Sequence, residues 1–204
     1  MILATRHPMT RFSKPILVIL PAVLVAAPSC MYRQVEAPEA SPRTAQEQRI
    51  IDDFKQRVDR YEDVSGKLED EVYPPSPELD PATIHARQKE LAARILKALP
   101  AWKQGDIFTP EIAALFKRRI AEIVNGPDGA NIKGSIFDDA PGDMPIKVFT
   151  EYPAGVPIAT LPAQMLKVFP ALPKELEYRF LGPDLILMDI AAFLIVDVIP
   201  DAIK

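Results

Sequence analysis

The sequence predicts an α+β protein: an N-terminal antiparallel helical hairpin and a third helix, followed by a small C-terminal antiparallel β-meander. Two observations predict this class. Over residues 47–126 the apolar residues recur three and four positions apart, which is the period of a helix. From residue 146 onward they recur at every second position, which is the period of a strand. We therefore expect a helical region over residues 47–126 and a small β region over residues 146–204 that packs on the helices.

Residues 1–29 are predicted to be a signal peptide. Residues 1–14 carry three cations and no acid, and an unbroken apolar run follows over residues 15–27. The run has about 13 residues, whereas a helix needs about 20 to cross a bilayer, so an export signal is favoured over a permanent span. Met9 is an alternative start that would shorten only the basic region.

Cleavage is expected just before Cys30, because Ala27 and Ser29 supply small residues three and one positions upstream. Cys30, the only cysteine, would then be the new N-terminus. This arrangement resembles a bacterial lipoprotein, in which that cysteine is acylated and anchors the chain, and the alternative is plain secretion with a free Cys30. The expected location is exported, either periplasmic or membrane-anchored through a lipid on Cys30, with no other membrane contact.

The charge balance argues against a nucleic-acid partner. The whole chain has a net charge of -4, and removal of residues 1–29 leaves 21 cations against 28 acids. An acidic chain of this kind binds a polyphosphate poorly. Lys117, Arg118 and Arg119 form the one dense basic cluster, and on a helix these residues point to different sides, so we expect a solvated surface there.

Residues 30–46 are predicted to be a flexible tether, because they are polar, contain prolines and show no period. A helix follows until the prolines of residues 73–79 stop it. Its apolar positions form a heptad seam in which Ser65 takes one slot: Ile51, Phe54, Val58, Tyr61, Leu68 and Val72. Packing of this seam within the chain makes a hairpin, and a parallel homodimer through residues 50–72 is the competing arrangement.

Two further helices begin at strong start signals. Asp80-Pro81 and Thr109-Pro110 each combine an N-cap acceptor with a proline at the first helical position. The second helix runs to Pro100, with its seam at Ile84, Leu91, Ile95 and Ala98. The third runs to Gly126 and buries Ile112, Leu115, Phe116, Ile120 and Ile123.

Residues 127–145 are rich in Gly, Asp and Pro and are predicted to be a connecting loop, with a short turn at residues 132–137. Strand periods then follow at residues 146–150 and 156–158, and one or two helical turns are expected over residues 162–169. The richest strand patterns are LEYRFL, DLILMDI and FLIVDVI, at residues 176–181, 184–190 and 193–199.

The link Gly182-Pro183 fixes the register of the first hairpin. If Leu181 pairs with Asp184, then Tyr178 faces Leu187 on the core side of the sheet, and the alternate residues lie on the other side. Since the second side is also apolar, at Ile186, Met188 and Ile190, both faces require a cover, and we expect the helices to provide it.

The chain is poor in catalytic residues. His85 is the only histidine after the signal peptide, and Ser135 has no nucleophile-elbow motif around it, so a Ser135–His85 dyad is disfavoured against a surface histidine. Zinc sites draw on clusters of His and Cys, which are lacking. Asp138, Asp139 and Asp143 are expected to be a solvated acidic loop and not a calcium site, because they lack the EF-hand spacing. We predict no metal and no cofactor.

Asp189 and Asp197 are the weak catalytic candidates, because each interrupts an apolar strand and a buried carboxylate can act as an acid. With a two-residue link at residues 191–192 they lie on opposite faces, and one extra residue puts them on the same face. Structural pairing is the favoured interpretation, with Arg179 as the nearest cationic partner.

Trp102 and Arg179 are the weak candidates for ligand or partner contact. Trp102 follows the end of the second helix, and the favoured interpretation is a hydrophobic plug between two helices. An exposed aromatic for sugar or partner contact is the alternative.

Three segments carry a resemblance: LEYRFLGPDLILMDIAAFLIVDVIPDAI, KQGDIFTPEIA and EYPAGVPIATLP. Together they resemble a family of uncharacterised exported bacterial proteins with a helical N-terminal half. The resemblance extends over residues 46–203 and implies an exported location, without an activity or a ligand.

The favoured functional expectation is an exported, non-enzymatic cell-envelope protein, lipid-anchored or free, whose helical hairpin or sheet face binds an envelope protein or a cell-wall component. The alternative is a carboxylate-dependent hydrolase or small-ligand binder that acts on envelope polysaccharide, with Asp189 and Asp197 opening into one cleft.

Overall fold

The structure is a computed structural model that describes residues 44–73, 80–139, 146–153, 155–158 and 161–203. All of them belong to one unit, residues 39–204. The predicted signal peptide, Cys30 and all but the end of the predicted tether lie outside the described residues.

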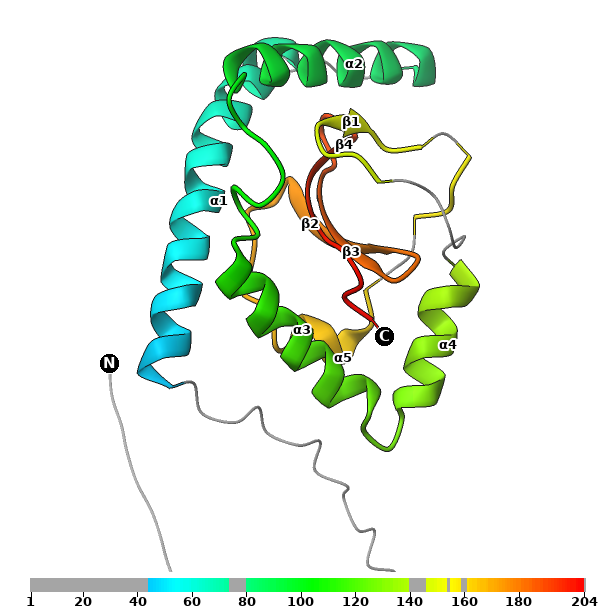
Figure 1. Cartoon of the computed structure of the whole chain (residues 1–204). Coiled ribbons are helices and arrows are strands. Elements are labelled where there is room, and N and C mark those ends of the chain that lie inside the picture. The colour runs from blue at the N-terminus through cyan, green and yellow to red at the C-terminus, as the bar shows by residue number, and fades with distance from the viewer. Residues whose placement is uncertain (1–43, 74–79, 140–145, 154, 159–160, 204) are drawn as a thin grey trace, which may run out of the picture. The chain divides into compact units, whose positions relative to one another are not determined.

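The fold is α+β, as the sequence predicts, with helices first and an antiparallel sheet after them (Figure 1). The sheet has the order β1-β4-β3-β2, in which β2, β3 and β4 form the predicted meander. The helices are α1 (Ala45–Val72), α2 (Pro81–Ala98), α3 (Pro110–Val124), α4 (Gly129–Asp139) and α5 (Ala163–Leu166). The strands are β1 (Thr150–Glu151), β2 (Leu176–Leu181), β3 (Asp184–Asp189) and β4 (Leu194–Ile199).

Both predicted helix starts are confirmed. Asp80 accepts hydrogen bonds from the backbone N–H groups of Ala82 and Thr83, and Pro81 follows it at the first helical position. Thr109 caps α3 in the same way, through a 3.5 Å bond from the backbone of Ile112. These caps satisfy donors that have no partner inside the helix.

The first two helices contact each other, but α2 crosses the C-terminal end of α1 instead of running along it (Figure 1). Arg94 of α2 therefore reaches Glu71 near the end of α1, with 2.9 Å between Nη1 and Oε2. As a result, Leu91 and Ile95 are buried, whereas Ile84 is 38% exposed and Ala98 is exposed, so only half of the predicted α2 seam is used. The α1 seam is buried within the chain, with Leu68 half-buried.

The prediction of a connecting loop over residues 127–145 is wrong for residues 129–139, which form α4. Ile132 and Ile136, one helical turn apart, are buried in the main core. This tertiary burial outweighs the weak helix propensity of Gly129 and Gly134.

The strands expected at residues 146–150 and 156–158 are reduced to the two residues of β1. Phe149 has a φ of 56°, in the left-handed region that extended chain does not enter, so a strand cannot continue through it. The helical turn expected at residues 162–169 is present as α5.

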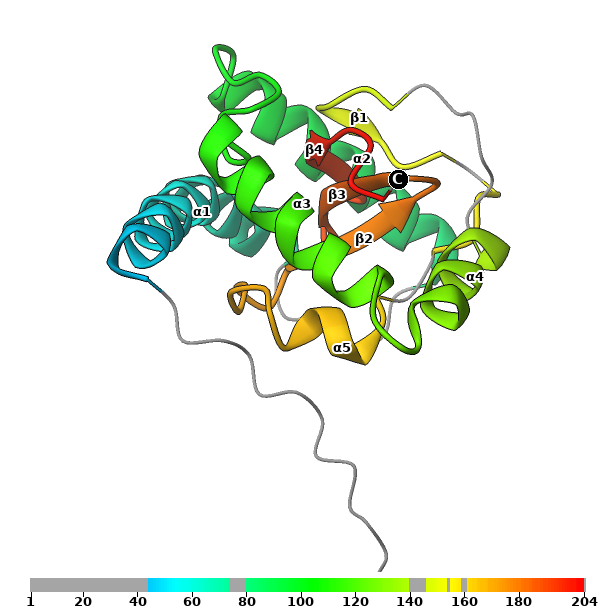
Figure 2. The same ribbon diagram turned by 60° about the horizontal axis from the view of Figure 1, so that its bottom comes forward.

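The hairpin register is confirmed: Leu181 pairs with Asp184, and Tyr178 pairs with Leu187. One face of the sheet lies in the main core with the helices. The expectation that helices also cover the second face is wrong, because Ile186 and Met188 there pack with Tyr152, and with Val148 and other residues of the segment around β1. Figure 2 shows α3 and α5 on one side of β2 and β3 and this segment on the other.

Candidate functional site

A groove of about 550 Å³ lies beside β2, between this strand, α5 and the segment that joins them. Its volume falls within the range of about 300–1,000 Å³ that is typical of small-ligand sites. Its lining is mainly apolar, with a few charged side chains: Leu161, Leu166, Phe169, Pro170, Ala171, Leu172, Pro173, Lys174, Leu176, Glu177, Tyr178 and Arg179.

Aromatic packing fixes the inner wall of the groove. The Phe169 ring centroid lies 4.6 Å from that of Phe116 on α3 and 5.0 Å from that of Tyr178 on β2. The Tyr178 hydroxyl donates a 3.1 Å hydrogen bond to the Pro170 carbonyl, which holds the joining segment against the strand. Burial raises the pKa of Tyr178 well above its usual value, so this phenol stays a neutral donor.

The short helix α5 places one apolar side chain inward and the next one outward. Met165 is fully buried in the main core, whereas its neighbour Leu166 is 59% exposed and lines the groove. An exposed leucine at the mouth of an apolar groove costs solvation free energy that a bound apolar ligand would recover.

Charged side chains border the groove. Arg179 forms an ion pair with Glu177 on the same strand, and Lys174 Nζ lies 2.9 Å from Glu175 Oε1. Arg179, a predicted ligand contact, therefore does line a candidate site. The expectation that it pairs with a buried aspartate is wrong, because it lies opposite Ile186 on the face that turns away from the helices.

Asp197 is buried and bound by backbone donors on all sides. Oδ1 accepts from Gly105 at 2.9 Å and from Val198 at 2.8 Å, and Oδ2 accepts from Ile107 at 2.9 Å and from Phe108 at 2.8 Å. Burial raises the pKa of this carboxyl, and the backbone hydrogen bonds act in the opposite direction. Asp197 thus anchors the loop of residues 103–109 to β4.

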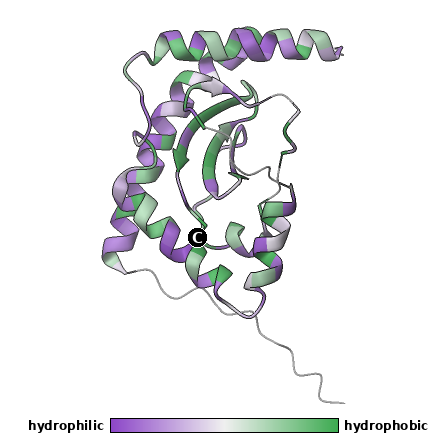
Figure 3. Ribbon diagram, turned by 45° about the vertical axis from the view of Figure 1, so that its right-hand side comes forward, coloured by the Kyte–Doolittle hydropathy of each residue, from purple (hydrophilic) through white to green (hydrophobic). Residues whose placement is uncertain are grey.

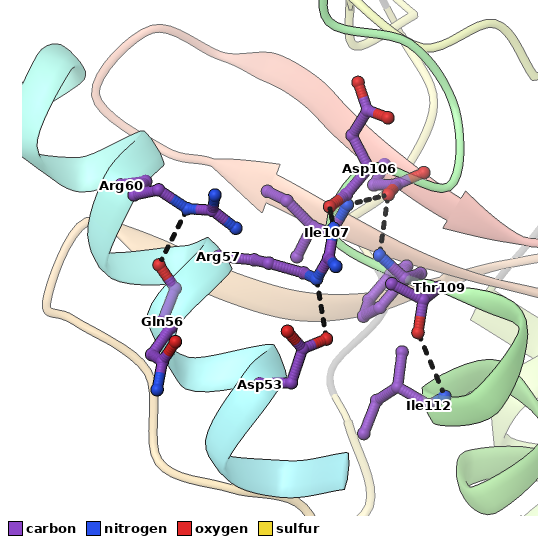
Figure 4. A network of polar contacts seen from close by, with 10 residues as sticks. Asp53, Gln56, Arg57, Arg60, Asp106, Ile107, Thr109 and Ile112 are labelled. Atoms are coloured by element: carbon purple, nitrogen blue, oxygen red, sulfur yellow. Dashed lines mark hydrogen bonds and ion pairs between the residues drawn. The ribbon is translucent and has the colours of Figure 1, made fainter.

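Arg57 of α1 holds the same loop from the other side (Figure 4). Its Nη1 donates a 2.9 Å hydrogen bond to the Asp106 carbonyl, while its Nε lies 2.7 Å from Asp53 Oδ2. The loop is therefore fixed between the first helix and the last strand of the sheet.

Asp189 is also buried, and its partners come from different elements. The Tyr61 hydroxyl donates to Oδ2 at 2.9 Å, and the Ala192 backbone donates to Oδ1 at 2.9 Å. Burial raises the pKa of Asp189, and both hydrogen bonds lower it. Burial and the neighbouring Asp189 raise the pKa of Tyr61 well above its usual value.

The two aspartates lie on the same face of the sheet. Met188 pairs with Ile195, whereas Leu187 pairs with Asp197, so β4 has one extra residue, a β-bulge, at this point. The bulge puts Asp197 on the same face of the sheet as Asp189. The extra residue that the sequence analysis considered for the link at residues 191–192 thus lies within β4. Asp189 and Asp197 are each 1% exposed, and both oxygens of each carboxylate accept hydrogen bonds from protein donors. This geometry favours structural pairing over catalysis.

Trp102 is half-buried against the main core, with its ring centroid 5.9 Å from that of Tyr61. This packing favours the plug interpretation over an exposed contact for sugar.

The remaining candidates have separate partners. The Ser135 hydroxyl donates to the Ile132 carbonyl, and His85 Nδ1 lies 3.8 Å from Glu151 Oε1 at the surface. Asp143 lies outside the described residues. Within the described ranges, no three His, Cys, Asp or Glu side chains gather in a way that could hold a metal ion.

The basic cluster is only partly solvated, which differs from the expectation. Arg118 forms an ion pair with Glu47 of α1, and Arg119 Nη2 lies 2.9 Å from the same carboxylate. Arg119 is half-buried, so this pair joins α3 to the start of α1.

The groove beside β2 is not predicted by any motif in the sequence. Its lining comes from the stretch FPALPKE at residues 169–175, together with Leu161 and Leu166. In this stretch, apolar side chains alternate with prolines and follow neither a helix period nor a strand period. The lack of a period is the one signal in the sequence that these apolar side chains line a surface groove and not the core.

No described helix is long and apolar enough to span a membrane. Comparisons with models of protein families, with curated proteins and with solved structures found no match to this chain.

Proposed function

We propose that this chain is an exported, non-enzymatic cell-envelope protein that binds an apolar ligand in the groove beside β2. The observation that carries the proposal is the groove itself: its walls are mainly apolar, and Leu166 at its mouth is 59% exposed. Preformed apolar cavities with a few charged groups at the border are the usual form of a binding site for small molecules.

The partners of the two buried aspartates support a binding role over an enzymatic one. Asp189 and Asp197, the two buried carboxylates in the described residues, both have raised pKa values, but they are engaged by protein donors and do not line the groove. Lys174, Glu177 and Arg179 at the groove are ion-paired, which suits orientation of a ligand more than proton transfer.

The experiment is a fluorescence titration of the protein with anilinonaphthalene sulfonate, an apolar anionic dye, followed by displacement with decanoate. We expect saturable binding and displacement. Leu166→Asp should weaken binding about tenfold or more, because it places a charge in the apolar mouth. Phe137→Asp is the matched control, since Phe137 is 43% exposed on α4 and does not line the groove.

Equal affinities for the Leu166→Asp protein and the unchanged protein would contradict the proposal. Displacement by cell-wall saccharide fragments but not by decanoate would also contradict it, in favour of the polysaccharide alternative.

The exported location has its own test, the intact mass of the protein isolated from its native membrane fraction. A chain that begins at an acylated Cys30 supports a lipoprotein, and one that begins at an unmodified Cys30 supports secretion. A chain that keeps residues 1–29 would contradict export.

A further inference from the structure

The outer face of α2 is a continuous exposed surface. Residues of α2 spaced four and three apart are all exposed, and their side chains lie on one side of the helix: Ala82, Ala86, Lys89, Ala93 and Leu96. His85 and Lys97, also exposed, border the same stripe. We call these seven residues the α2 outer face. A helix of this length is about 27 Å long.

The charge of α2 differs from that of the rest of the chain. It carries Arg87, Lys89, Arg94 and Lys97 against one acid, Glu90, whereas α1 carries nine acids and five cations. The chain as a whole has a net charge of -4. With four cations against one acid, α2 has a net charge of +3 within an acidic chain.

The two arginines and the two lysines of α2 have different roles. Arg94 forms ion pairs with Glu71 and Glu90, and the Arg87 guanidinium lies 5.8 Å from the centre of the Tyr73 ring. Lys89 and Lys97, by contrast, form no ion pair with any residue in the described part of the chain. The positive charges on the outer face therefore remain available, while the one acid of the helix is neutralised by Arg94.

The position of α2 leaves most of this face uncovered by the described residues; at its border, His85 Nδ1 lies 3.8 Å from Glu151 Oε1 of β1. Only α1 packs extensively on α2, through the side that carries Leu91 and Ile95. Figure 3 shows α2 along one end of the described fold, with hydrophilic and hydrophobic residues in alternation along it.

Leu96 favours an anionic lipid surface over an anionic polymer as the partner of this face. Its side chain is 39% exposed on the same stripe as Lys89. A purely ionic polymer gains nothing from a leucine, whereas a lipid surface offers headgroup charge and acyl chains side by side. The three alanines of the stripe have short side chains, so the helix backbone can lie close to a flat surface.

We propose that the α2 outer face binds the surface of membranes that contain anionic phospholipids, with Lys89 and Lys97 at the headgroups and Leu96 at the acyl boundary. This contact is peripheral. It is independent of the groove beside β2 and of a lipid on Cys30.

The experiment measures partition of the full chain onto sedimenting vesicles, either of phosphatidylcholine alone or of phosphatidylcholine mixed with phosphatidylglycerol. The Lys89→Gln/Lys97→Gln protein should partition onto the anionic vesicles about 30-fold less than the unchanged protein, which corresponds to about 2 kcal/mol for two surface cations. Leu96→Gln should lower partition about fivefold. Added salt should weaken the preference for anionic vesicles.

The matched control is Lys55→Gln/Lys67→Gln, which removes two exposed lysines from α1 and should leave partition unchanged. Because all variants keep residues 1–43, any contribution of that segment is common to them. Equal losses in the control and the α2 variant would overturn the proposal. Loss in the lysine variant with no change in Leu96→Gln would also overturn it, since the face would then bind anions in general and not a lipid interface.

Discussion

Tyr61 on α1 and Asp189 at the end of β3 are 128 positions apart in the sequence, yet the Tyr61 hydroxyl donates a 2.9 Å hydrogen bond to Asp189 Oδ2 inside the core. Both residues are at most 1% exposed. The bond therefore links the helical half of the chain to the sheet at a place that water does not reach.

Tyr61→Phe should lower the free energy of unfolding by about 1–3 kcal/mol, because it leaves a buried carboxylate oxygen without its donor. Denaturant unfolding followed by circular dichroism measures this change. Tyr73→Phe is the control: its hydroxyl donates to the Ala191 carbonyl, a neutral acceptor, and Tyr73 is only half-buried, so its loss should be smaller. Equal losses would indicate that the charge of Asp189 adds nothing.

The stability contribution of Asp189 should fall as the pH rises. Burial raises its folded pKa above the unfolded value of roughly 3.9, so the folded state binds the proton more tightly than the unfolded state does. The contribution is thus fully present below the unfolded pKa and is lost as the pH rises through the folded pKa. The stability difference between the unchanged protein and Asp189→Asn should accordingly be larger at about pH 4 than at about pH 7. A difference that grows with pH would show that the hydrogen bonds, and not burial, dominate the pKa.

Asp197→Asn should destabilise the fold by about 3 kcal/mol, since the amide NH₂ would face backbone N–H donors that now bind a carboxylate. Hydrogen exchange of the Gly105, Ile107 and Phe108 amides should accelerate with it. Asp184→Asn provides the comparison: Asp184 accepts a single bond from the Asp201 backbone at the surface, and we expect a loss below about 1 kcal/mol. Unchanged exchange in the loop would refute its anchoring by Asp197.

Gly105→Ala should cost about 1–2 kcal/mol. Gly105 has a φ of 88°, a conformation that strains any residue with a Cβ. The cost is conformational and not steric, because the nearest atom to an added Cβ, the Phe108 carbonyl oxygen, would be 3.9 Å away. Gly66→Ala, inside the C-terminal part of α1, should instead stabilise the protein by about 0.5–1 kcal/mol, because alanine has a better helix propensity than glycine. Thermal unfolding of both variants separates a conformational effect from a general effect of adding a methyl group.

Much of the fold could be predicted because single residues decide it locally. The Gly182-Pro183 link sets the register of β2 and β3, and the caps at Asp80 and Thr109 set two helix starts. The face of Asp197 could not be predicted, because almost every residue of β4 is apolar and no alternation marks where the β-bulge lies. Helix α4 was missed because its stability comes from tertiary burial of Ile132 and Ile136 and not from its own propensity.

The candidate site was less predictable than the fold. Asp189, Asp197 and Trp102 stand out in the sequence as unusual residues in apolar surroundings, and the structure uses all three within or against the core. The groove beside β2 is made of ordinary leucines and prolines, which a sequence pattern cannot distinguish from core residues. Of the predicted site residues that the structure describes, only Arg179 reaches it.

The strand order β1-β4-β3-β2 places the last strand of the sheet between two others, and Asp197 on that strand anchors the loop before α3. A chain that emerges from the ribosome N-terminus first thus lacks the centre of its sheet until residues 194–199 have been made. Until then, α1 and α3 have at most the β2–β3 hairpin to cover, and much of their apolar surface stays accessible to chaperones and proteases. We therefore expect a chain that terminates before residue 194 to leave the sheet unformed, and the described domain to fold only once β4 has emerged.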